Sequence, residues 1–407
     1  MIETAPIVQA PLAPFDKQSR TRLVFGNGTL ARLGELAAEL EKRRVLLVTD
    51  RGIVAAGHAD HARQILEKAG LRVATYGEAT ENPTTLDVAQ CVEVARAHQA
   101  DLLVGLGGGS SMDTAKGCNF IYTNGGVMSD YWGVNKARQA MLPLIAIPTT
   151  AGTGSECQSA ALIADEQTHL KMACLDTKVT PRIAILDPEL TVSQPQRVTT
   201  CAGIDAVAHA VETAVTTRRH AISTMYSREA FKLCVTSLPR VLANPRDLDA
   251  RGRMLLGAAL AGTAIEQSML GAAHSAANPL TAHFGIAHGQ AVGMLLPLVV
   301  AFNGEDPAAQ LAYAELASAP EIACVSEGSE FAWRALIARL EALLNLAGIP
   351  RSLADCGVRR ELIPTLADEA ARQWTANFNP RRMTVADFVK LYEAAFVPRG
   401  EGDGAGE

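Results

Sequence analysis

The stretch DLLVGLGGGSSMDTAK, residues 101–116, decides the fold class of this chain. It opens as a short apolar strand at residues 101–105, passes through a run of glycines and continues with helical spacing. Glycines let the backbone turn sharply and approach a ligand closely. Ser110 is a typical N-cap residue for the helix that follows. The backbone N–H groups at such a helix start favour an anion such as a pyrophosphate.

The glycine spacing differs from the G-x-G-x-x-G fingerprint of Rossmann folds, so a tight turn without a ligand stays open at this point. The surrounding chain repeats the alternation of strand and helix. Further apolar runs of strand length occur at residues 44–49, 71–76, 144–147 and 183–186, and helical spacing at residues 61–69 and 84–98. Unbroken apolar strands separated by helices indicate a parallel sheet covered on both faces.

The character of the chain changes after residue 193, where strand-like runs nearly vanish. Long Ala/Leu-rich segments with helical periodicity follow at residues 206–215, 227–238, 251–267 and 331–346. We therefore predict an α/β domain, Rossmann-like with a parallel sheet, at residues 1–190. An all-helical domain at residues 191–400 and a disordered, Gly- and acid-rich tail at residues 401–407 complete the chain.

The composition excludes several functional classes. The 407 residues carry a net charge of −6, which argues against a dedicated nucleic-acid surface. The longest apolar run, residues 291–302, is too short to span a bilayer, so no membrane association is expected. The start of the chain lacks the basic and apolar regions of a signal peptide. Eight scattered cysteines fit reduced thiols in a cytoplasmic protein.

A second loop, PTTAGTGSE at residues 148–156, follows the strand at 144–147. It offers hydroxyls and glycines at the carboxyl end of a strand, where open α/β sheets bind ligands. Asp50 ends the strand at 44–49. Its carboxylate can accept hydrogen bonds from ribose hydroxyls and repel a 2′-phosphate, which favours NAD over NADP. A helix cap is the alternative role for Asp50, and the adjacent Arg51 can instead attract a phosphate.

A carboxylate and three imidazoles form a candidate metal site. Asp205 and His209 are four residues apart in a helical segment, which places both on one helix face. His274 and His288 come later, and we expect Pro279 and Gly285 to interrupt the segment between them and separate it into two elements. Such a set suits Fe²⁺ or Zn²⁺, although separate, hydrogen-bonded core histidines remain the alternative.

Taken together, these motifs resemble the iron-containing (group III) alcohol dehydrogenase family over nearly the whole chain. The matching pieces, in order, are residues 25–28 (FGNG), 48–50 (VTD), 82–84 (NPT), 107–113 with Lys116, 148–156, 203–212 (GIDAVAHAVE), 274, 279–280, 288–289, 379–381 (NPR) and 391–395. The resemblance implies a nucleotide-binding α/β domain, a helical metal-binding domain and an active site between them, the fold shared with dehydroquinate synthase. It also implies a homodimer or larger homo-oligomer.

The resemblance further implies the roles of individual residues. The metal ligands would be Asp205, His209, His274 and His288, with Fe²⁺ expected and Zn²⁺ as the alternative. The residues that would contact NAD are Asp50, Asn82, Gly108, Gly109, Ser110, Thr149, Thr150, Thr153 and Lys171. The substrate space would be bordered by Ala160, Ile265 and Thr375.

The sequence departs from the family beside the metal site. Many members carry a histidine four residues after the third ligand, where this chain has Asn278, and the glycine usual after Pro-Leu is Thr281. We expect a reversible, NAD-linked exchange between an alcohol and its aldehyde or ketone, with Asn278 beside the reacting groups. The alternatives are a glycerol-type polyol dehydrogenase, a dehydroquinate synthase-like lyase, or a nucleotide-binding sensor without turnover. Asp205 argues against the lyase, because that family is expected to supply Glu there.

Overall fold

A computed structural model of the chain describes residues 15, 18–167 and 170–396. The proposed tail at residues 401–407 lies outside the described residues. The strands are β1 (Arg22–Phe25), β2 (Arg44–Val48), β3 (Arg72–Tyr76), β4 (Leu102–Gly107), β5 (Gly133–Val134), β6 (Leu144–Pro148), β7 (Ala160–Ala164), β8 (Lys171–Leu175) and β9 (Ile183–Leu186). The α-helices of the sheet-bearing part are α1 (Leu33–Ala38), α2 (Arg51–Ala55), α3 (His58–Lys68), α4 (Thr85–His98) and α5 (Gly109–Asn124).

Six parallel strands form the main sheet in the order β1-β9-β6-β4-β2-β3. Strand β4 lies between β2 and β6, and Gly107 of β4 is in register with Pro148 of β6. The chain moves from β2 outward to β3 and then returns to the other side of β2 as β4. Loops that diverge at such a switch point form the usual ligand site of an open α/β sheet.

Helices cover both faces of this sheet, as the unbroken apolar strands predict. Along β2, Leu46 and Val48 join a core with residues of α4 and α5. Val45 and Leu47 point the other way and join a core with residues of α1 and α3. This alternation arises because successive side chains of a strand point to opposite faces. The predicted α/β fold is confirmed.

A small three-stranded sheet, β5-β8-β7, was not predicted from the sequence. Strands β7 and β8 pair antiparallel, and β5 pairs parallel with β8. The edge strand β1 was also missed, since it has only four residues and three of them are exposed. A short apolar run such as AALIA at residues 160–164 cannot be told from a helical segment by its periodicity alone.

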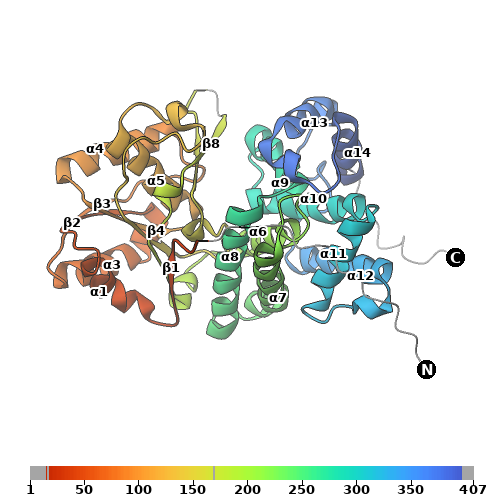
Figure 1. The fold of residues 1–407 in the computed structure, drawn as a ribbon, viewed down its shortest axis with the longest axis horizontal. Helices are drawn as coiled ribbons and strands as arrows, with labels where there is room; N and C mark the ends of the chain where they lie inside the picture. Colours follow the sequence, from red (N-terminus) through yellow and green to blue (C-terminus); the bar gives the residue numbers. More distant parts are fainter. Residues whose placement is uncertain (1–14, 16–17, 168–169, 397–407) are drawn as a thin grey trace.

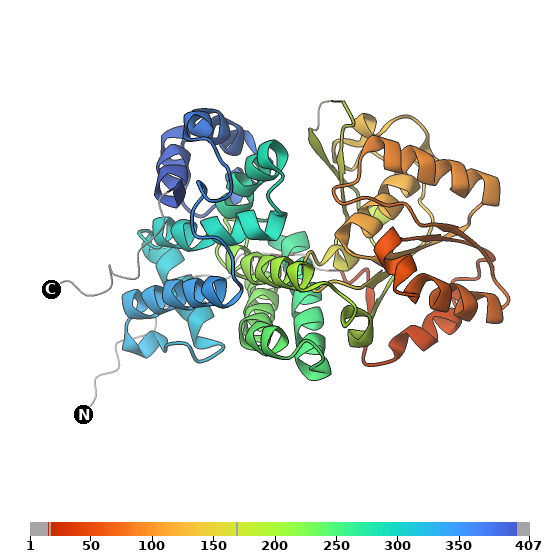
Figure 2. The same ribbon diagram turned by 180° about the vertical axis from the view of Figure 1, so that it is seen from behind.

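The rest of the chain is helical and lies beside the sheet-bearing part along the long axis of the molecule (Figure 1), as the reverse view also shows (Figure 2). It comprises α6 (Gln196–Thr213), α7 (Ala221–Ala243), α8 (Leu248–Ser268), α9 (Ala272–Phe284), α10 (His288–Asn303), α11 (Pro307–Ser318), α12 (Ser329–Leu346), α13 (Ile363–Arg372) and α14 (Val385–Phe396). Short 3₁₀ helices include η3 (Ser155–Cys157) and η8 (Trp374–Phe378). Among the described residues, no helix combines the length and apolarity needed to cross a bilayer. The proposed boundary near residue 190 falls between β9 and α6 and stays a prediction.

Two local expectations were wrong. Helix α5 begins at Gly109 with Gly108 as its N-cap, so Ser110 lies inside the first turn and does not cap it. The close packing of the glycine turn on its neighbours sets this start, and a side-chain cap is absent. Pro279 does not interrupt the helix but lies inside α9. The packing of α9 against α10 and α13 outweighs the backbone hydrogen bond that a proline cannot donate. Gly285 does end α9, in the left-handed conformation at φ 63°.

Candidate metal and cofactor site

One face of helix α6 supplies two of the four candidate ligands. Asp205 and His209 lie one turn apart on it, and both are buried. His274 comes from the first turn of α9, and His288 is the first residue of α10. The prediction that His274 and His288 lie on two elements is confirmed. Helix α10 packs against both α6 and α9, and the three helices together bring into one place side chains more than 60 residues apart in the sequence.

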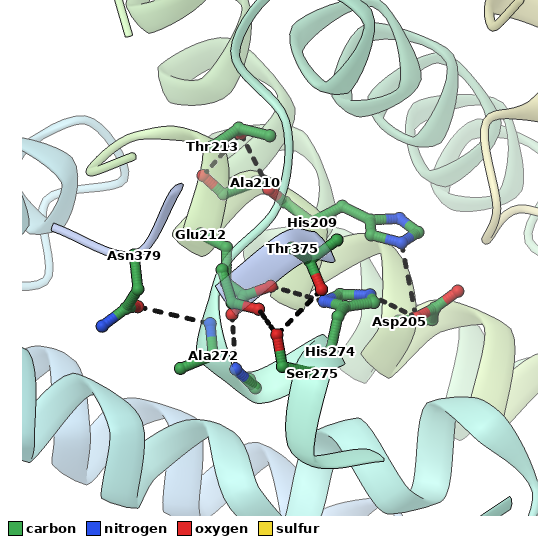
Figure 3. A network of polar contacts seen from close by, with 12 residues as sticks. Asp205, His209, Ala210, Glu212, Thr213, Ala272, His274, Ser275, Thr375 and Asn379 are labelled. Carbon is green, nitrogen blue, oxygen red and sulfur yellow. Dashed lines mark hydrogen bonds and ion pairs between the residues drawn. The ribbon is translucent and has the colours of Figure 1, made fainter. Parts of the chain in front are cut away.

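The three imidazoles converge on a single carboxylate oxygen, Asp205 Oδ1 (Figure 3 shows Asp205, His209 and His274). Its distances to the Nε2 atoms are 3.5 Å for His209, 3.4 Å for His274 and 3.9 Å for His288. Ligand atoms of Asp205, His209 and His274 all lie within 4.8 Å of one another. The His288 side chain is 29% exposed, so the site opens on that side.

Outer hydrogen bonds fix the orientation of two of the imidazoles. His209 Nδ1 lies 3.3 Å from the carbonyl oxygen of Gly152, and His274 Nδ1 lies 2.5 Å from Glu212 Oε2. A carbonyl and a carboxylate only accept, so both rings carry a proton on Nδ1 and direct Nε2 toward Asp205. This is the tautomer that a metal-binding imidazole needs.

The donor set fits a divalent cation. Asp205 Oδ1, His274 Nε2 and His288 Nδ1 are buried polar atoms without a hydrogen-bond partner. Such atoms are costly, because burial removes water without replacing its hydrogen bonds. One carboxylate and neutral imidazoles facing a common point suit Fe²⁺ or Zn²⁺, and bound metal would satisfy the orphaned atoms that face it.

Electrostatics keep most of these groups in the metal-binding protonation state. Burial raises the pKa of Asp205, but the neighbouring imidazoles outweigh this effect and hold it well below its usual range. Burial lowers the pKa of His209, and it lowers that of His288 to about 3. Burial also lowers the pKa of His274, yet Glu212 and Asp205 together raise it to about 9. Metal binding must therefore displace a proton from His274.

The glycine-rich turn after β4 packs against the loop after β6. A side-chain carbon added at Gly108 would lie 3.3 Å from Thr150 Cγ2, and one at Gly109 would lie 2.7 Å from Thr153 Cγ2. A side chain at Gly109 would therefore force Thr153 to move, and one at Gly108 would press on Thr150. Ser110 follows in the first turn of α5, and the amide of Thr149 donates to the Gly107 carbonyl at 2.9 Å. Five of the predicted cofactor residues thus form one surface at the switch point, together with Thr149.

The same loop connects this surface to the metal residues. Gly152 lies between Thr150 and Thr153, and its carbonyl oxygen accepts from His209. It also packs closely on α6, because a Cβ added at Gly152 would lie 2.8 Å from the Ala202 side chain. Gly154, at φ 63°, packs on the backbone of α8, where an added Cβ would lie 2.6 Å from the Ala258 carbonyl oxygen. The loop therefore joins the nucleotide side of the site to the helices that hold the metal ligands.

Asp50 occupies the end of β2 beside the glycine turn. Its Oδ1 accepts from the Ile53 amide at 3.0 Å, so it caps α2, and its Oδ2 accepts from Ser111 Oγ at 3.0 Å. The helix-cap role is thus present, and the ribose contact of Asp50 stays a prediction. Arg51 forms an ion pair with Glu78, with 2.5 Å between Nη2 and Oε2, which reduces its availability for a phosphate.

Asn82 and Lys171 form a separate pair at the small sheet, with 3.4 Å between Lys171 Nζ and Asn82 Oδ1. Asn82 adopts a left-handed conformation at φ 55°, and Lys171 is the first residue of β8. The β-bridge between Thr84 and Ala164 holds this loop to the end of β7. The small sheet therefore positions both residues, Lys171 as part of β8 and Asn82 through the neighbouring bridge to β7.

Asn278 lies one turn after His274 on α9, and its Nδ2 donates to Gln373 Oε1 at 3.1 Å. His283 on the same helix is 2.9 Å from Glu369 Oε2. Thr375 shares a hydrogen bond of 2.8 Å with Ser275, next to His274. Ile265 lies buried in α8 and Ala160 begins β7, so the border of the substrate space that they would form stays a prediction.

Sequence reasoning missed two features of this region. Glu212 stood within a matched motif without a role, although its spacing of three residues from His209 places it on the same face of α6. Lys116 is fully buried and donates to the carbonyl oxygens of Ser155 and Ala160 and to Ser155 Oγ. It thus ties α5 to η3 and β7, a role that only the packing of distant segments reveals.

The parallel sheet with its glycine-rich turn thus brings a candidate nucleotide site next to a buried Asp/His cluster that could hold a metal ion. The family model of iron-containing alcohol dehydrogenase matches residues 20–188, and that of the C-terminal region of the Fe-containing alcohol dehydrogenase family matches residues 199–396. The chain belongs to the iron-containing alcohol dehydrogenase family. The predicted family and enzyme class are confirmed.

Similar proteins cover almost the whole chain. The NAD-dependent methanol dehydrogenase of Bacillus methanolicus is 34% identical over 372 residues, which are 91% of this chain and 97% of that protein. Alcohol dehydrogenase 4 of Schizosaccharomyces pombe is also 34% identical, over 91% of this chain and 87% of that protein. A solved 1,3-propanediol oxidoreductase superposes with a TM-score of 0.91 at 29% identity, covering 94% of this chain and all of that one.

Proposed function

We propose that this protein catalyses the reversible, NAD(H)-linked reaction R–CHOH–R′ + NAD⁺ ⇌ R–CO–R′ + NADH + H⁺ on a small alcohol. The observation that carries the proposal is the convergence of three imidazoles on one buried, unpartnered oxygen of Asp205, connected through Gly152 to the nucleotide loop. Family membership and the NAD dependence of the methanol dehydrogenase relative support it.

Asp205, His209, His274 and His288 would hold one divalent metal, Fe²⁺ by the family's chemistry, with Zn²⁺ as the alternative. Such a metal polarises the substrate oxygen as a Lewis acid. Gly152 and Glu212 keep the lone pairs of two imidazoles directed at the ion position. The chain's own contribution is thus a rigid, largely buried cage that is open beside His288.

The nucleotide would bind across the switch point, and its nicotinamide ring supplies the hydride chemistry. Backbone N–H groups at Gly108, Gly109 and Ser110 would bind the pyrophosphate. The hydroxyls of Thr149, Thr150 and Thr153 would complete that contact, Asp50 would bind the adenosine ribose, and Asn82 and Lys171 would contact the dinucleotide further along. Because one loop contacts both the glycine turn and His209, the nicotinamide end would lie near the metal residues.

Position 278 offers no titrating side chain that could accept the proton released during alcohol oxidation. An asparagine amide does not ionise in the working range, so Asn278 can only position a water or a polar group of the substrate. The nearby His283 is engaged by Glu369. The proton would therefore leave through solvent or a ribose hydroxyl of the cofactor.

The small-molecule substrate follows from the family, whereas assembly and compartment remain part of this proposal. We expect a homodimer or larger homo-oligomer, since this is the usual state implied by the family resemblance. We also expect a cytoplasmic location, because no disulfide joins any of the eight cysteines, all of which lie within the described residues.

The test is an assay of metal-stripped protein reloaded separately with Fe²⁺ and Zn²⁺, with a panel of primary and secondary alcohols and NAD⁺. We expect NADH formation that requires metal, and a parallel loss of metal content and turnover in Asp205→Ala. A matched substitution outside the site, Glu330→Ala on the exposed face of α12, controls for handling. Full turnover in metal-free protein would contradict the proposal, and product formation without net NADH would favour the lyase.

A further inference from the structure

Glu212 extends the ligand-bearing face of α6 by one turn. Asp205, His209 and Glu212 occupy positions i, i+4 and i+7, and all three side chains are buried. The His274 ring lies between the first and the last of them, with Nε2 3.4 Å from Asp205 Oδ1 and Nδ1 2.5 Å from Glu212 Oε2 (Figure 3). One imidazole of α9 is thus held between two carboxylates of α6.

The second oxygen of Glu212 contacts the start of α9. Glu212 Oε1 accepts from the Ala273 amide at 2.7 Å, one of the N–H groups that a helix start leaves without an internal partner. Gly271, the N-cap, leaves room for this contact, because an added Cβ would lie 3.1 Å from Glu212 Oε1. Both carboxylate oxygens therefore act as acceptors, one for the ligand ring and one for the helix that carries it.

No neutral isostere reproduces this arrangement. A glutamine has one accepting oxygen and one donating NH₂ group. If its oxygen faces His274 Nδ1, its NH₂ faces the Ala273 N–H, and if it is turned over, its NH₂ faces the ring N–H. In the first orientation two donors meet in a buried environment, which is costly. In the second they also meet unless the ring moves its proton to Nε2, the atom that a metal would bind.

The other imidazoles lack such a partner. His209 is oriented by the backbone carbonyl of Gly152, and His288 Nδ1 has no hydrogen-bond partner within the described part of the chain. We infer that Glu212 is a positioning residue for the metal centre. It fixes the tautomer of His274, increases the electron density at Nε2 and sets the distance between the α6 and α9 ligands.

This inference rests on the proposed function, since it requires that the cluster holds a metal. A carboxylate behind a metal-binding histidine typically changes metal affinity by about 10–100-fold when it is removed. Glu212→Gln should therefore bind Co²⁺ and Zn²⁺ about 10–100-fold more weakly. The visible absorption bands of bound Co²⁺ should also shift, because they report the geometry and strength of the ligand field.

The experiment measures Co²⁺ and Zn²⁺ affinity by chelator competition on metal-stripped full-length protein, with thermal unfolding of the stripped protein beside it. Asn379→Ala is the matched control. Asn379 Oδ1 accepts from the neighbouring Ala272 amide at 3.3 Å, and the same side chain bonds to Asn303 and to the Arg381 carbonyl oxygen. This variant therefore weakens the docking of the same helix start, together with these two contacts, without touching His274. We expect Asn379→Ala to keep metal affinity within about threefold of the wild type.

Metal affinity and a Co²⁺ spectrum like those of the wild type in Glu212→Gln would overturn the inference. A loss of metal affinity in Asn379→Ala equal to that in Glu212→Gln would overturn it too, because Glu212 would then act only by docking the helix. If Glu212→Gln does not fold, Glu212→Asp decides. Its charge is retained but its carboxylate is one methylene further from His274, so weaker Co²⁺ binding supports the inference and unchanged binding overturns it. Wild-type protein that binds no Co²⁺ would overturn the proposed function as well, whereas tight binding by wild type and variants alike removes only this inference.

Discussion

Substituting Gly154 by alanine should destabilise the protein through contact with α8, and the structure offers a matched control for the backbone contribution. Gly154 and Gly285 have the same left-handed conformation, with φ 63° and ψ 18° at the first and φ 63° and ψ 19° at the second. An alanine pays the left-handed cost, about 1–2 kcal/mol, at both positions. With the backbone cost matched, the comparison isolates what surrounds the new methyl group.

At Gly285 nothing lies within 4 Å of an added Cβ. At Gly154 the Cβ would lie 2.6 Å from the Ala258 carbonyl oxygen and 2.6 Å from Gly262 Cα, both backbone atoms of α8 that cannot rotate away. Forcing extra atoms into a packed region costs about 1–3 kcal/mol. We expect the free energy of unfolding to fall by about 1–2 kcal/mol in Gly285→Ala and by about 2–5 kcal/mol in Gly154→Ala.

Urea unfolding followed by far-UV circular dichroism measures both losses. NAD⁺ affinity should also fall in Gly154→Ala, because the methyl group displaces the loop that carries Thr150 and Thr153. Equal unfolding midpoints for the two alanine variants would refute the steric argument. It would mean that the loop moves away from α8 at little cost.

Three further outcomes follow from the site. Asp50→Gly should lower the ratio of kcat/KM for NAD⁺ to that for NADP⁺, since it removes the charge that repels a 2′-phosphate. Equal kcat/KM values for the two cofactors in the wild type would contradict this role of Asp50. Asn278→His should introduce an ionisation near pH 6.5 into the pH profile of kcat/KM at unchanged metal content. If the wild-type profile already shows an ionisation near pH 6.5, and His283→Ala keeps it, the proposal that no side chain at position 278 titrates in this reaction would lose its support. Burial raises the pKa of Glu156 to about 7, so the folded protein favours the protonated carboxyl of this residue. The free energy of unfolding should therefore fall as the pH rises from about 4.5 through 7. Glu156→Gln should therefore raise Tm relative to wild type more at pH 8 than at pH 5, and an identical difference at both pH values would rule this out.

Local patterns in the sequence determined much of this protein. Unbroken apolar strands predicted a parallel sheet with two covered faces, and Val45 to Val48 indeed divide between two cores. The spacing of Asp205 and His209 placed them on one face of a helix, since periodicity needs no knowledge of the partner. Several ordered motifs identified the family, because a run of independent matches is far more specific than any one of them.

Tertiary structure alone decided which atoms meet. The hydrogen bond between His274 and Glu212 joins residues 62 apart, and that between His209 and Gly152 joins residues 57 apart. Neither can be read from spacing, because both depend on how α6 packs against α9 and against the loop after β6. Packing also kept Pro279 inside a helix and moved the start of α5 ahead of Ser110, since contacts between distant segments outweigh local preferences of a fraction of a kcal/mol to about 3 kcal/mol.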